Sequence, residues 1–358
     1  MADGSKIEWT DATWNVVIGC DKVSPGCDHC YAIRTAHRMQ ANPNPKIAAA
    51  YAGTEADGEW TGQVNLVEDR LELPLSWTRP RRIFVNAQSD LFHKDVPDEF
   101  IARVWAVMAL APQHTFQILT KRHARMRALL RTDMFHELVQ DAIGAQVWGG
   151  GVKGAVADTV RRRYIAWLPL TPTWPLPNVW LGVSVEDQKR ADLRIPALLD
   201  TPAAVRWLSC EPLLGPVDLT HMDVERHSES MYWINALTGR NRDMGRPCRD
   251  VESIDWVVVG GESGPGSRPM HPDWARTLRD QCVVAGIPFL FKQWGEWSPE
   301  QGGRGQDVLI DLDGNGIAWS KFAQSSTAAQ MWRTGKRAAG RELDGRTWDE
   351  YPQEVSRG

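Results

Sequence analysis

The chain has 358 residues, of which 42% are hydrophobic and 24% are charged, and its formal net charge is −4. This length suits one large α/β barrel with insertions or two domains, and the composition allows an ordinary buried core. The negative net charge excludes a globally basic nucleic-acid binder, so any nucleic-acid site must be local. No apolar run reaches the roughly 18 residues of a membrane span, and the polar N-terminus has no signal-peptide stretch. We therefore expect a cytoplasmic protein with no membrane partner.

Seven short apolar runs each end abruptly in polar residues. They cover residues 14–19, 83–85, 115–119, 179–183, 205–208, 256–259 and 289–291. Helical spacing of apolar residues follows over 97–110 and 271–285. Short apolar strands that alternate with helices are typical of a parallel sheet. At least six such units favour an α/β fold, a full or partial TIM-type (β/α) barrel with parallel strands and loop insertions. A doubly wound open sheet would also place its site at the carboxyl ends of the strands.

Three segments interrupt this alternation. Residues 149–178 are rich in Gly, Pro and Trp, and residues 221–249 are polar with little periodicity, so we interpret both as insertions or lid loops. The stretch 298–358 is rich in Gly, Asp and Arg and has weak periodicity. The predicted organisation is a barrel domain over 1–297 with insertions near 149–178 and 221–249, followed by a C-terminal extension over 298–358.

Three of the six cysteines, Cys20, Cys27 and Cys30, lie within eleven residues. In a cytoplasmic chain, close cysteines indicate a metal site rather than disulfides. Thiolates are soft ligands that suit iron–sulfur clusters and zinc. A four-iron cluster held by three thiolates leaves one iron open to chelate the amino and carboxylate groups of S-adenosyl-L-methionine. A zinc site with His29 or His37 as fourth ligand is an alternative, and a chance cluster of unligated thiols is another.

Several motifs carry a resemblance to a known family. They are Glu8-Trp9-Thr10-Asp11-Ala12-Thr13-Trp14-Asn15, Gly19-Cys20, Ser24-Pro25-Gly26-Cys27-Asp28-His29-Cys30-Tyr31-Ala32, Phe84-Val85-Asn86, Ser89-Asp90-Leu91-Phe92-His93, Leu119-Thr120-Lys121-Arg122, Leu181-Gly182-Val183-Ser184-Val185-Glu186, Glu211-Pro212-Leu213 and Gly260-Gly261-Glu262-Ser263-Gly264. With these motifs the chain resembles the phage Gp37/Gp68 family over about residues 7–297. It is also similar, more distantly, to spore photoproduct lyase, a DNA-repair enzyme.

The resemblance implies a radical S-adenosyl-L-methionine-type enzyme with a 4Fe-4S cluster on Cys20, Cys27 and Cys30. Such an enzyme generates a 5′-deoxyadenosyl radical, and the phage context implies a nucleic-acid substrate in the host cell, modified or repaired. It also implies an external electron donor and a three-Cys-motif partner protein. One departure is the spacing: six residues separate the first two cysteines here, where the superfamily has three. The rival function is a zinc-stabilised nucleic-acid-binding protein without radical chemistry.

The resemblance also implies roles for residues at the strand ends. His29 precedes the last cysteine, where an aromatic residue of the superfamily touches the adenine. A Gly-Gly-Glu motif on the second strand usually binds the methionine amino group, whereas here that motif comes much later. The expected cofactor-binding residues are His29, Asn86, Ser89, Asp90, Glu186, Gly260, Gly261 and Glu262. For each acid, capping of a following helix is the alternative.

Two further groups have candidate roles. Cys210 follows a predicted strand and would serve as a catalytic hydrogen-atom donor, although a buried structural thiol is the commoner explanation. Lys121, Arg122 and Arg125 share a helix face and form a candidate nucleic-acid site, with a solvated surface as the alternative. Strand-end placement further predicts one cavity that holds the three cysteines together with Asn86, Thr120, Glu186, Glu211 and Glu262.

Overall fold

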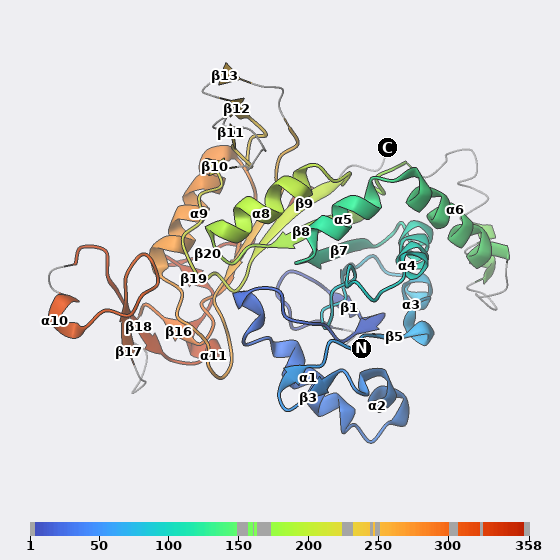
Figure 1. The fold of residues 1–358 in the computed structure, drawn as a ribbon, viewed down its shortest axis with the longest axis horizontal. Helices are drawn as coiled ribbons and strands as arrows, with labels where there is room; N and C mark the ends of the chain where they lie inside the picture. Colours follow the sequence, from blue (N-terminus) through green and yellow to red (C-terminus); the bar gives the residue numbers. More distant parts are fainter. Residues whose placement is uncertain are drawn as a thin grey trace. The chain divides into compact units, whose positions relative to one another are not determined.

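The computed structural model describes residues 4–148, 157–159, 161–162, 173–223, 232–243, 246–247, 251–300, 307–322 and 325–353 (Figure 1). The chain divides into two compact units. Unit 1 holds residues 1–23, 32–182 and 201–205, and unit 2 holds residues 24–31, 183–200 and 206–358. The division assigns the short segment 24–31 to a unit whose other residues are far away in the sequence.

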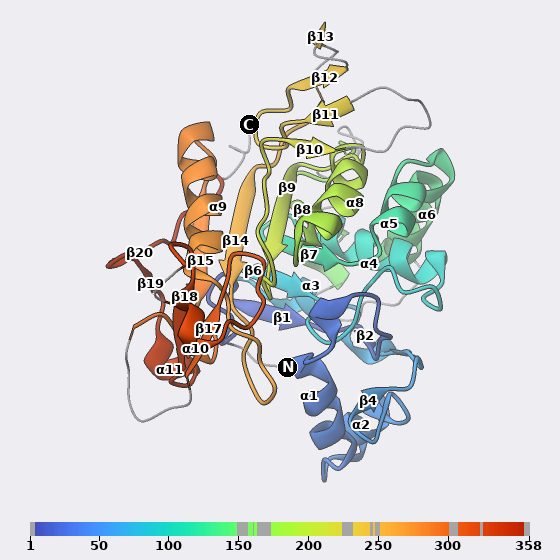
Figure 2. The ribbon, with the colours of Figure 1, turned by 60° about the vertical axis from the view of Figure 1, so that its left-hand side comes forward.

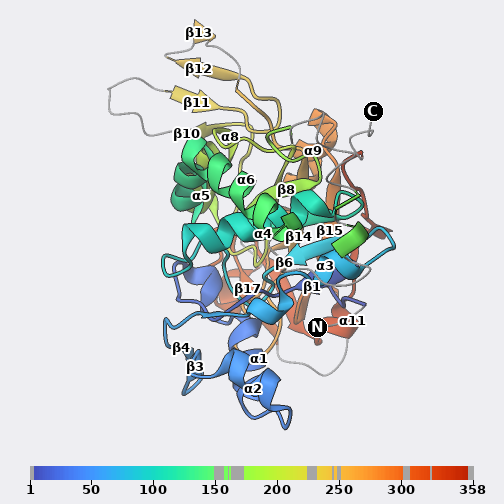
Figure 3. The same cartoon turned by 90° about the vertical axis from the view of Figure 1, so that its right-hand side faces the viewer.

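Unit 1 is built on parallel strands with buried faces. β1 (Ala12–Trp14), β6 (Arg82–Val85) and β7 (Thr115–Thr120) pair in parallel. Helices α4 (Asp98–Leu110) and α6 (Asp133–Trp148) pack on each other, as Figure 3 shows. Burial of every apolar residue of α4 explains why its sequence is apolar on nearly all sides.

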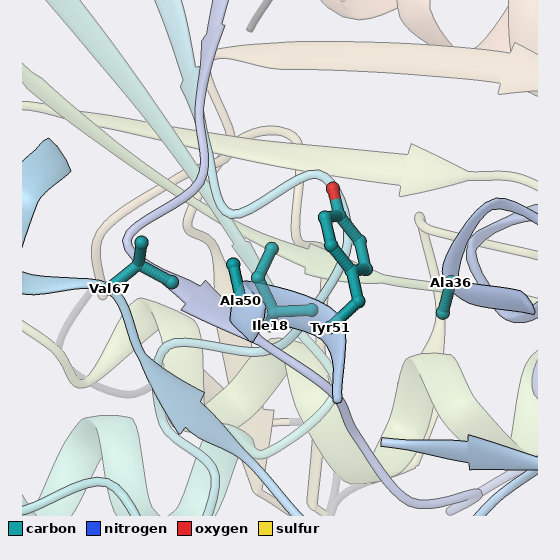
Figure 4. Packing of buried hydrophobic residues seen from close by; sticks show 5 residues of the cluster. All are labelled: Ile18, Ala36, Ala50, Tyr51 and Val67. Atoms are coloured by element: carbon teal, nitrogen blue, oxygen red, sulfur yellow. The ribbon is translucent and has the colours of Figure 1, made fainter. Parts of the chain in front are cut away.

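A small satellite core forms at the N-terminal side of unit 1. The β2 strand (Val17–Ile18) pairs antiparallel with β5 (Asn65–Leu66), and α1 (Tyr31–Gln40) and α2 (Pro45–Tyr51) lie beside this pair. Its buried members are Ile18, Ala36, Ala50, Tyr51 and Val67 (Figure 4). This core anchors the chain directly before the cysteine loop.

Unit 2 continues the same alternation of strand and helix. Its strands are the end of β8 (Val179–Ser184), β9 (Val205–Cys210), β14 (Trp256–Gly260) and β15 (Phe289–Gln293). The pairs β9–β14 and β14–β15 are parallel, and α9 (Pro272–Ala285) packs on β14 and β15 (Figure 2). Helix α8 (Gln188–Leu199) follows β8. Every residue of β8, β9 and β14 is buried, which is what near-continuous apolar runs predict for a parallel sheet.

The described strands confirm a mixed α/β fold with a parallel sheet, but not a closed barrel. The strand order is β1-β6-β7-β8-β9-β14-β15, and β1 and β15 stand at its two ends. Because no pairing joins those two strands in the described parts of the chain, the sheet is consistent with the partial TIM-type alternative and not with a closed barrel. Within the same described ranges, no helix combines the length and the apolar character that crossing a membrane requires.

The remaining elements are short. Most of the predicted insertion 149–178 lies outside the described residues, whereas 221–249 contributes a small antiparallel sheet of β10 (Met222–Asp223), β11 (Tyr232–Ile234), β12 (Asn241–Asp243) and β13 (Arg246–Pro247). The C-terminal stretch forms β16 (Trp297–Ser298), β17 (Asp307–Ile310), α10 (Trp319–Phe322), β18 (Ala329–Arg333), α11 (Lys336–Ala339), β19 (Glu342–Leu343) and β20 (Arg346–Thr347). Also present are β3 (Glu55–Ala56), β4 (Glu59–Trp60), α3 (Leu73–Ser76), α5 (His123–Leu130) and two short 3-10 helices, Pro25–Cys27 and Glu68–Arg70.

Candidate functional site

The cysteine loop starts where the first strands of unit 1 end. Gly19 follows β2 with a φ of 98°, and a Cβ there would lie 2.1 Å from the Gln63 carbonyl oxygen. Only glycine fits this position without strain. Cys20 follows directly, and Cys27 closes the 3-10 turn by donating its backbone N–H to the Ser24 carbonyl at 2.8 Å. Cys20 belongs to unit 1, while Cys27 and Cys30 belong to unit 2.

In unit 1, Cys20 lies beside a partly buried cation. Arg122 Nη1 is 3.5 Å from the Cys20 sulfur and 3.1 Å from Asp90 Oδ2, and the same guanidinium also pairs with Asp21. Burial by itself would lower the pKa of Arg122, but Asp90, Cys20 and Asp21 outweigh burial and raise that pKa. Arg122 therefore stays charged, and one cation serves the Cys20 sulfur, Asp90 and Asp21 together.

The three strand-end residues expected to bind a cofactor have protein partners in unit 1. Asn86, at a φ of 59°, accepts hydrogen bonds through its Oδ1 from the backbone N–H groups of Val16 (3.0 Å) and Val17 (3.1 Å). Ser89 donates its hydroxyl to the Val17 carbonyl at 2.8 Å. Asp90 accepts from the Thr120 hydroxyl at 2.7 Å and from the Lys121 backbone at 3.0 Å. These contacts join the β2 region to the ends of β6 and β7.

Two of the three candidate nucleic-acid residues, Arg122 and Arg125, contact other residues of unit 1. Arg122 contacts Cys20, as described above. Arg125 donates to the carbonyls of His93 and Val96 and pairs with Asp98 at 2.5 Å. These two guanidinium groups therefore bind their own unit, and the structure gives them an internal role that basic spacing alone did not indicate.

In unit 2, Glu186 at the end of β8 contacts the cysteine loop. Its Oε1 accepts from the Ser24 hydroxyl at 2.6 Å, and its Oε2 pairs with Arg194 Nη1 at 2.8 Å. Both charged side chains are almost wholly buried, at 0% exposed for Glu186 and 3% for Arg194. Gly26 is needed here, because a Cβ on it would lie 2.6 Å from the Glu186 side chain.

Glu262 lies at the end of β14 and binds Arg268. Oε1 of Glu262 accepts from Arg268 Nη2 at 2.7 Å, and Oε2 accepts from Arg268 Nε at 3.0 Å. The same guanidinium reaches the loop, donating to the Pro25 carbonyl at 2.8 Å and to Asp28 Oδ2 at 3.2 Å. Burial would lower the pKa of Arg268, but Glu262 and Asp28 outweigh it and raise that pKa. Arg268 is thus a permanent cation between a strand end and the cysteine loop.

The glycines before Glu262 approach protein rather than open space. A Cβ on Gly261 would lie 2.0 Å from the Trp294 carbonyl oxygen, and one on Gly260 would lie 3.4 Å from the Glu211 carboxylate. We expected Gly260 and Gly261 to bind a cofactor. In the structure, the backbone that lies close to Gly261 is that of Trp294, directly after β15. His29 faces a third glycine, since a Cβ on Gly266 would lie 2.9 Å from its ring.

Two other groups lie at the strand ends of unit 2. Lys292 on β15 pairs with both oxygens of Glu211, at 2.7 and 2.8 Å, and Gln293 donates to Glu211 Oε1 at 3.2 Å. Cys210 is wholly buried at the end of β9, and burial is the main cause that raises the pKa of its thiol. Burial likewise raises the pKa of Cys282 on α9 to about 12. Full burial favours the structural explanation for Cys210.

The strand-end residues therefore form a network within each unit. One joins Asp90, Thr120 and Arg122 to Cys20, and the other joins Glu186 and Glu262 to the loop that carries Cys27 and Cys30. Among the residues that the structure describes, no three His, Cys, Asp or Glu side chains form a group that could hold a metal ion. Convergence of the three thiols, and one cavity common to all strand ends, stay predictions.

Sequence reasoning missed the cationic partners of the buried acids. Arg194 is eight residues after Glu186, and Arg268 is six residues after Glu262 in a loop. A signal was present, because a carboxylate at the end of a buried strand needs a counter-charge or a ligand. Nothing in the spacing decides between those two, so both arginines escaped notice, as did Lys292 beside Glu211.

Comparisons with known proteins give one match. Residues 4–352 fit the model of a family described as "Protein of unknown function (DUF5131)". No curated protein matches the chain, and no solved structure matches it either. Because the family model covers nearly the whole chain, this protein belongs to the DUF5131 family.

Proposed function

We propose that this chain is a radical S-adenosyl-L-methionine-type enzyme that builds a 4Fe-4S cluster on Cys20, Cys27 and Cys30. The observation that carries the proposal is the position of Cys20 next to Arg122 at the end of parallel strands. An open parallel sheet with polar residues at its strand ends suits a partial TIM-type barrel, which is the fold that the proposal uses.

The surroundings of the thiols suit cluster ligation. The thiolate, not the thiol, binds iron, and the Arg122 guanidinium donates toward the Cys20 sulfur at 3.5 Å. Cys27 is buried, and its sulfur lies 3.9 Å from the Ser24 hydroxyl. Hydrogen bonds to ligating sulfurs are one of the means by which proteins set cluster potentials. The donor set therefore fits iron–sulfur chemistry in ligand type.

When bound, the cluster would supply the electron that cleaves S-adenosyl-L-methionine to the 5′-deoxyadenosyl radical, which abstracts hydrogen from a substrate. The chain's own residues do the positioning. Arg122 holds Cys20 against the ends of β6 and β7 through Asp90, and Arg268 holds the turn around Cys27 against the end of β14. Outer contacts of this kind orient the residues that ligate a metal.

Nucleic acid is the proposed substrate class, by family analogy alone. The phage association carries this part of the proposal, together with an external electron donor and a three-Cys-motif partner protein. Because Arg122 and Arg125 bind residues of their own unit, other basic residues would have to contact the phosphates. Salt-dependent binding to single-stranded and duplex DNA would test this part separately.

The deciding experiment is anaerobic reconstitution with iron and sulfide. We expect visible absorbance, about four irons per chain and 5′-deoxyadenosine after addition of reductant and S-adenosyl-L-methionine. Cys27→Ala should lose all three signals while circular dichroism stays unchanged, because a chain of this length folds on its apolar core. Cys282→Ala is the matched control, since it removes a buried thiol far along the chain, on α9, and should keep the iron.

Two results would contradict the proposal. Retained 5′-deoxyadenosine production by Cys27→Ala would remove Cys27 from the ligand set. Wild-type protein that keeps stoichiometric zinc after iron reconstitution and never makes 5′-deoxyadenosine would instead support a zinc-stabilised nucleic-acid-binding protein.

A further inference from the structure

The segment 24–31 is held by residues that lie more than 150 positions later in the sequence. It groups with residues 183–200 and 206–358, although the residues on either side of it, Val23 and Ala32, belong to the other unit. Cys27 and Cys30 both lie in this segment. What holds it in place therefore sets where these two sulfurs lie.

The first attachment is on the amino-terminal side of Cys27. The Ser24 hydroxyl donates to Glu186 at 2.6 Å, and Arg194 fixes the other oxygen of that carboxylate at 2.8 Å. Arg194 also donates to the Ser184 carbonyl at 2.8 Å, so the pair is fastened to the end of β8. Gly26 packs so closely on Glu186 that no side chain fits between them.

The second attachment brackets Cys27 from both sides. Arg268 donates to the Pro25 carbonyl before Cys27 and to the Asp28 carboxylate after it, at 2.8 and 3.2 Å. Glu262 holds Arg268 by two side-chain contacts and a third to the Arg268 backbone N–H at 2.8 Å. A planar guanidinium can serve several acceptors in fixed directions, which a lysine ammonium cannot do.

We infer that Glu186 and the Glu262–Arg268 pair are positioning residues that pre-form the Cys27 turn before any ligand binds. The identity of the group that the thiols hold rests on the proposed function, whereas the attachment of the turn does not. This positioning role reassigns both carboxylates from cofactor binding: Glu186 binds Arg194 and the Ser24 hydroxyl of the cysteine loop, and Glu262 holds Arg268, which contacts the loop. A turn held by two charged attachments loses little conformational freedom when metal binds.

The test begins with the apo protein. Arg268→Gln should expose the turn, so the backbone N–H groups of Cys27 and Asp28 should exchange with deuterium about tenfold faster or more, and Cys27 should alkylate faster. Arg268→Lys, which keeps the charge but not the fork, should restore only part of the protection. Arg276→Gln is the control, because Arg276 binds Asp273 and Asp344 in the same unit and makes no contact with the loop in the described residues.

A second readout follows cluster binding. After iron reconstitution, Arg268→Gln should hold less iron than the control and give an altered electron paramagnetic resonance spectrum, with partial recovery in Arg268→Lys. If Arg268→Gln proves unfolded, Ser24→Ala tests the same idea, since it removes one loop contact and leaves the Glu186–Arg194 pair intact.

The outcomes separate the two proposals. Exchange and alkylation rates in Arg268→Gln and Ser24→Ala that equal those of the wild type would overturn the positioning role. Wild-type protein that takes up no iron, with loop protection lost in Arg268→Gln, would refute the radical enzyme and leave the positioning role intact.

Discussion

Removing Arg194 should destabilise unit 2 far more than removing a neighbouring surface arginine. Glu186 is 0% exposed and relies on Arg194 at 2.8 Å, so Arg194→Met leaves a buried carboxylate without its cation. Breaking a buried pair in this way costs about 3–5 kcal/mol. With a urea m-value of about 3 kcal/mol/M, the unfolding midpoint should fall by about 1 M or more.

Urea unfolding followed by circular dichroism gives the measurement, with two comparison variants. Arg190→Met removes an arginine of the same helix whose ion pair with Asp187 is partly exposed, and it should cost about 1 kcal/mol or less. The double variant Glu186→Gln, Arg194→Met leaves no unpaired charge, so it should recover about 2 kcal/mol of the loss. Equal effects of Arg194→Met and Arg190→Met, or a double variant no more stable than Arg194→Met, would refute the reasoning.

Three more outcomes follow from the structure. Asn86→Ala should lower the free energy of unfolding in urea by about 2–4 kcal/mol, because two buried backbone amides lose their acceptor. Asn86→Asp keeps an oxygen acceptor for those amides and should cost less. His271 is the N-cap of α9, and burial is the main cause that lowers its pKa in the folded protein. As the pH falls below about 6.5, His271 takes up a proton in the unfolded state before it does so in the folded state, so the free energy of unfolding should fall. His271→Asn keeps the cap and should flatten that slope between pH 7.5 and 5.5; an unchanged slope would exclude His271 as its source. Iodoacetamide at pH 8 should label Cys210 and Cys282 at least about 100-fold more slowly in native protein than in urea, and equal rates would contradict their burial.

The strands were predictable because parallel strands are buried on both faces. Six of the seven apolar runs match a strand to within two residues at each end, as in β14 and β15. The first run failed in part, since the structure splits 14–19 into β1 and β2. Asn86 accepts hydrogen bonds from the backbone N–H groups of Val16, which lies between the two strands, and Val17, which begins β2. These bonds separate β2 from β1. A contact 70 residues away in the sequence leaves no trace in local apolar spacing.

Sheet closure was less predictable than strand position. Counting strand–helix units gives the number of strands, but closure depends on whether β1 and β15 meet, which no local pattern encodes. The C-terminal stretch also depends on tertiary contacts that local patterns do not encode. Its weak periodicity predicted only a C-terminal extension, and in the structure the Phe291 backbone N–H donates to the Trp348 carbonyl at 2.9 Å and Leu343 is buried.

The candidate site was predictable in position but not in partners. Glu186 and Glu262 come after buried strands, and that placement was evident from the apolar runs that precede them. Their arginines were not evident, because an i to i+8 spacing across a helix start and a six-residue loop have no fixed geometry. Whether a strand-end carboxylate faces a ligand or a guanidinium is decided by tertiary structure alone.

The grouping of segment 24–31 with much later residues has a consequence for synthesis on the ribosome. Ser24–Tyr31 leaves the ribosome well before Arg268, its farthest partner in the attachments described above. At translation rates of about 5–20 residues per second, that interval is about 12–50 s. The first attachment can form once Arg194 has emerged, but until Arg268 follows, the turn that carries Cys27 lacks the second one. On the proposed function, full pre-organisation of the Cys27 turn for metal binding would therefore be reached only after Arg268 has left the ribosome.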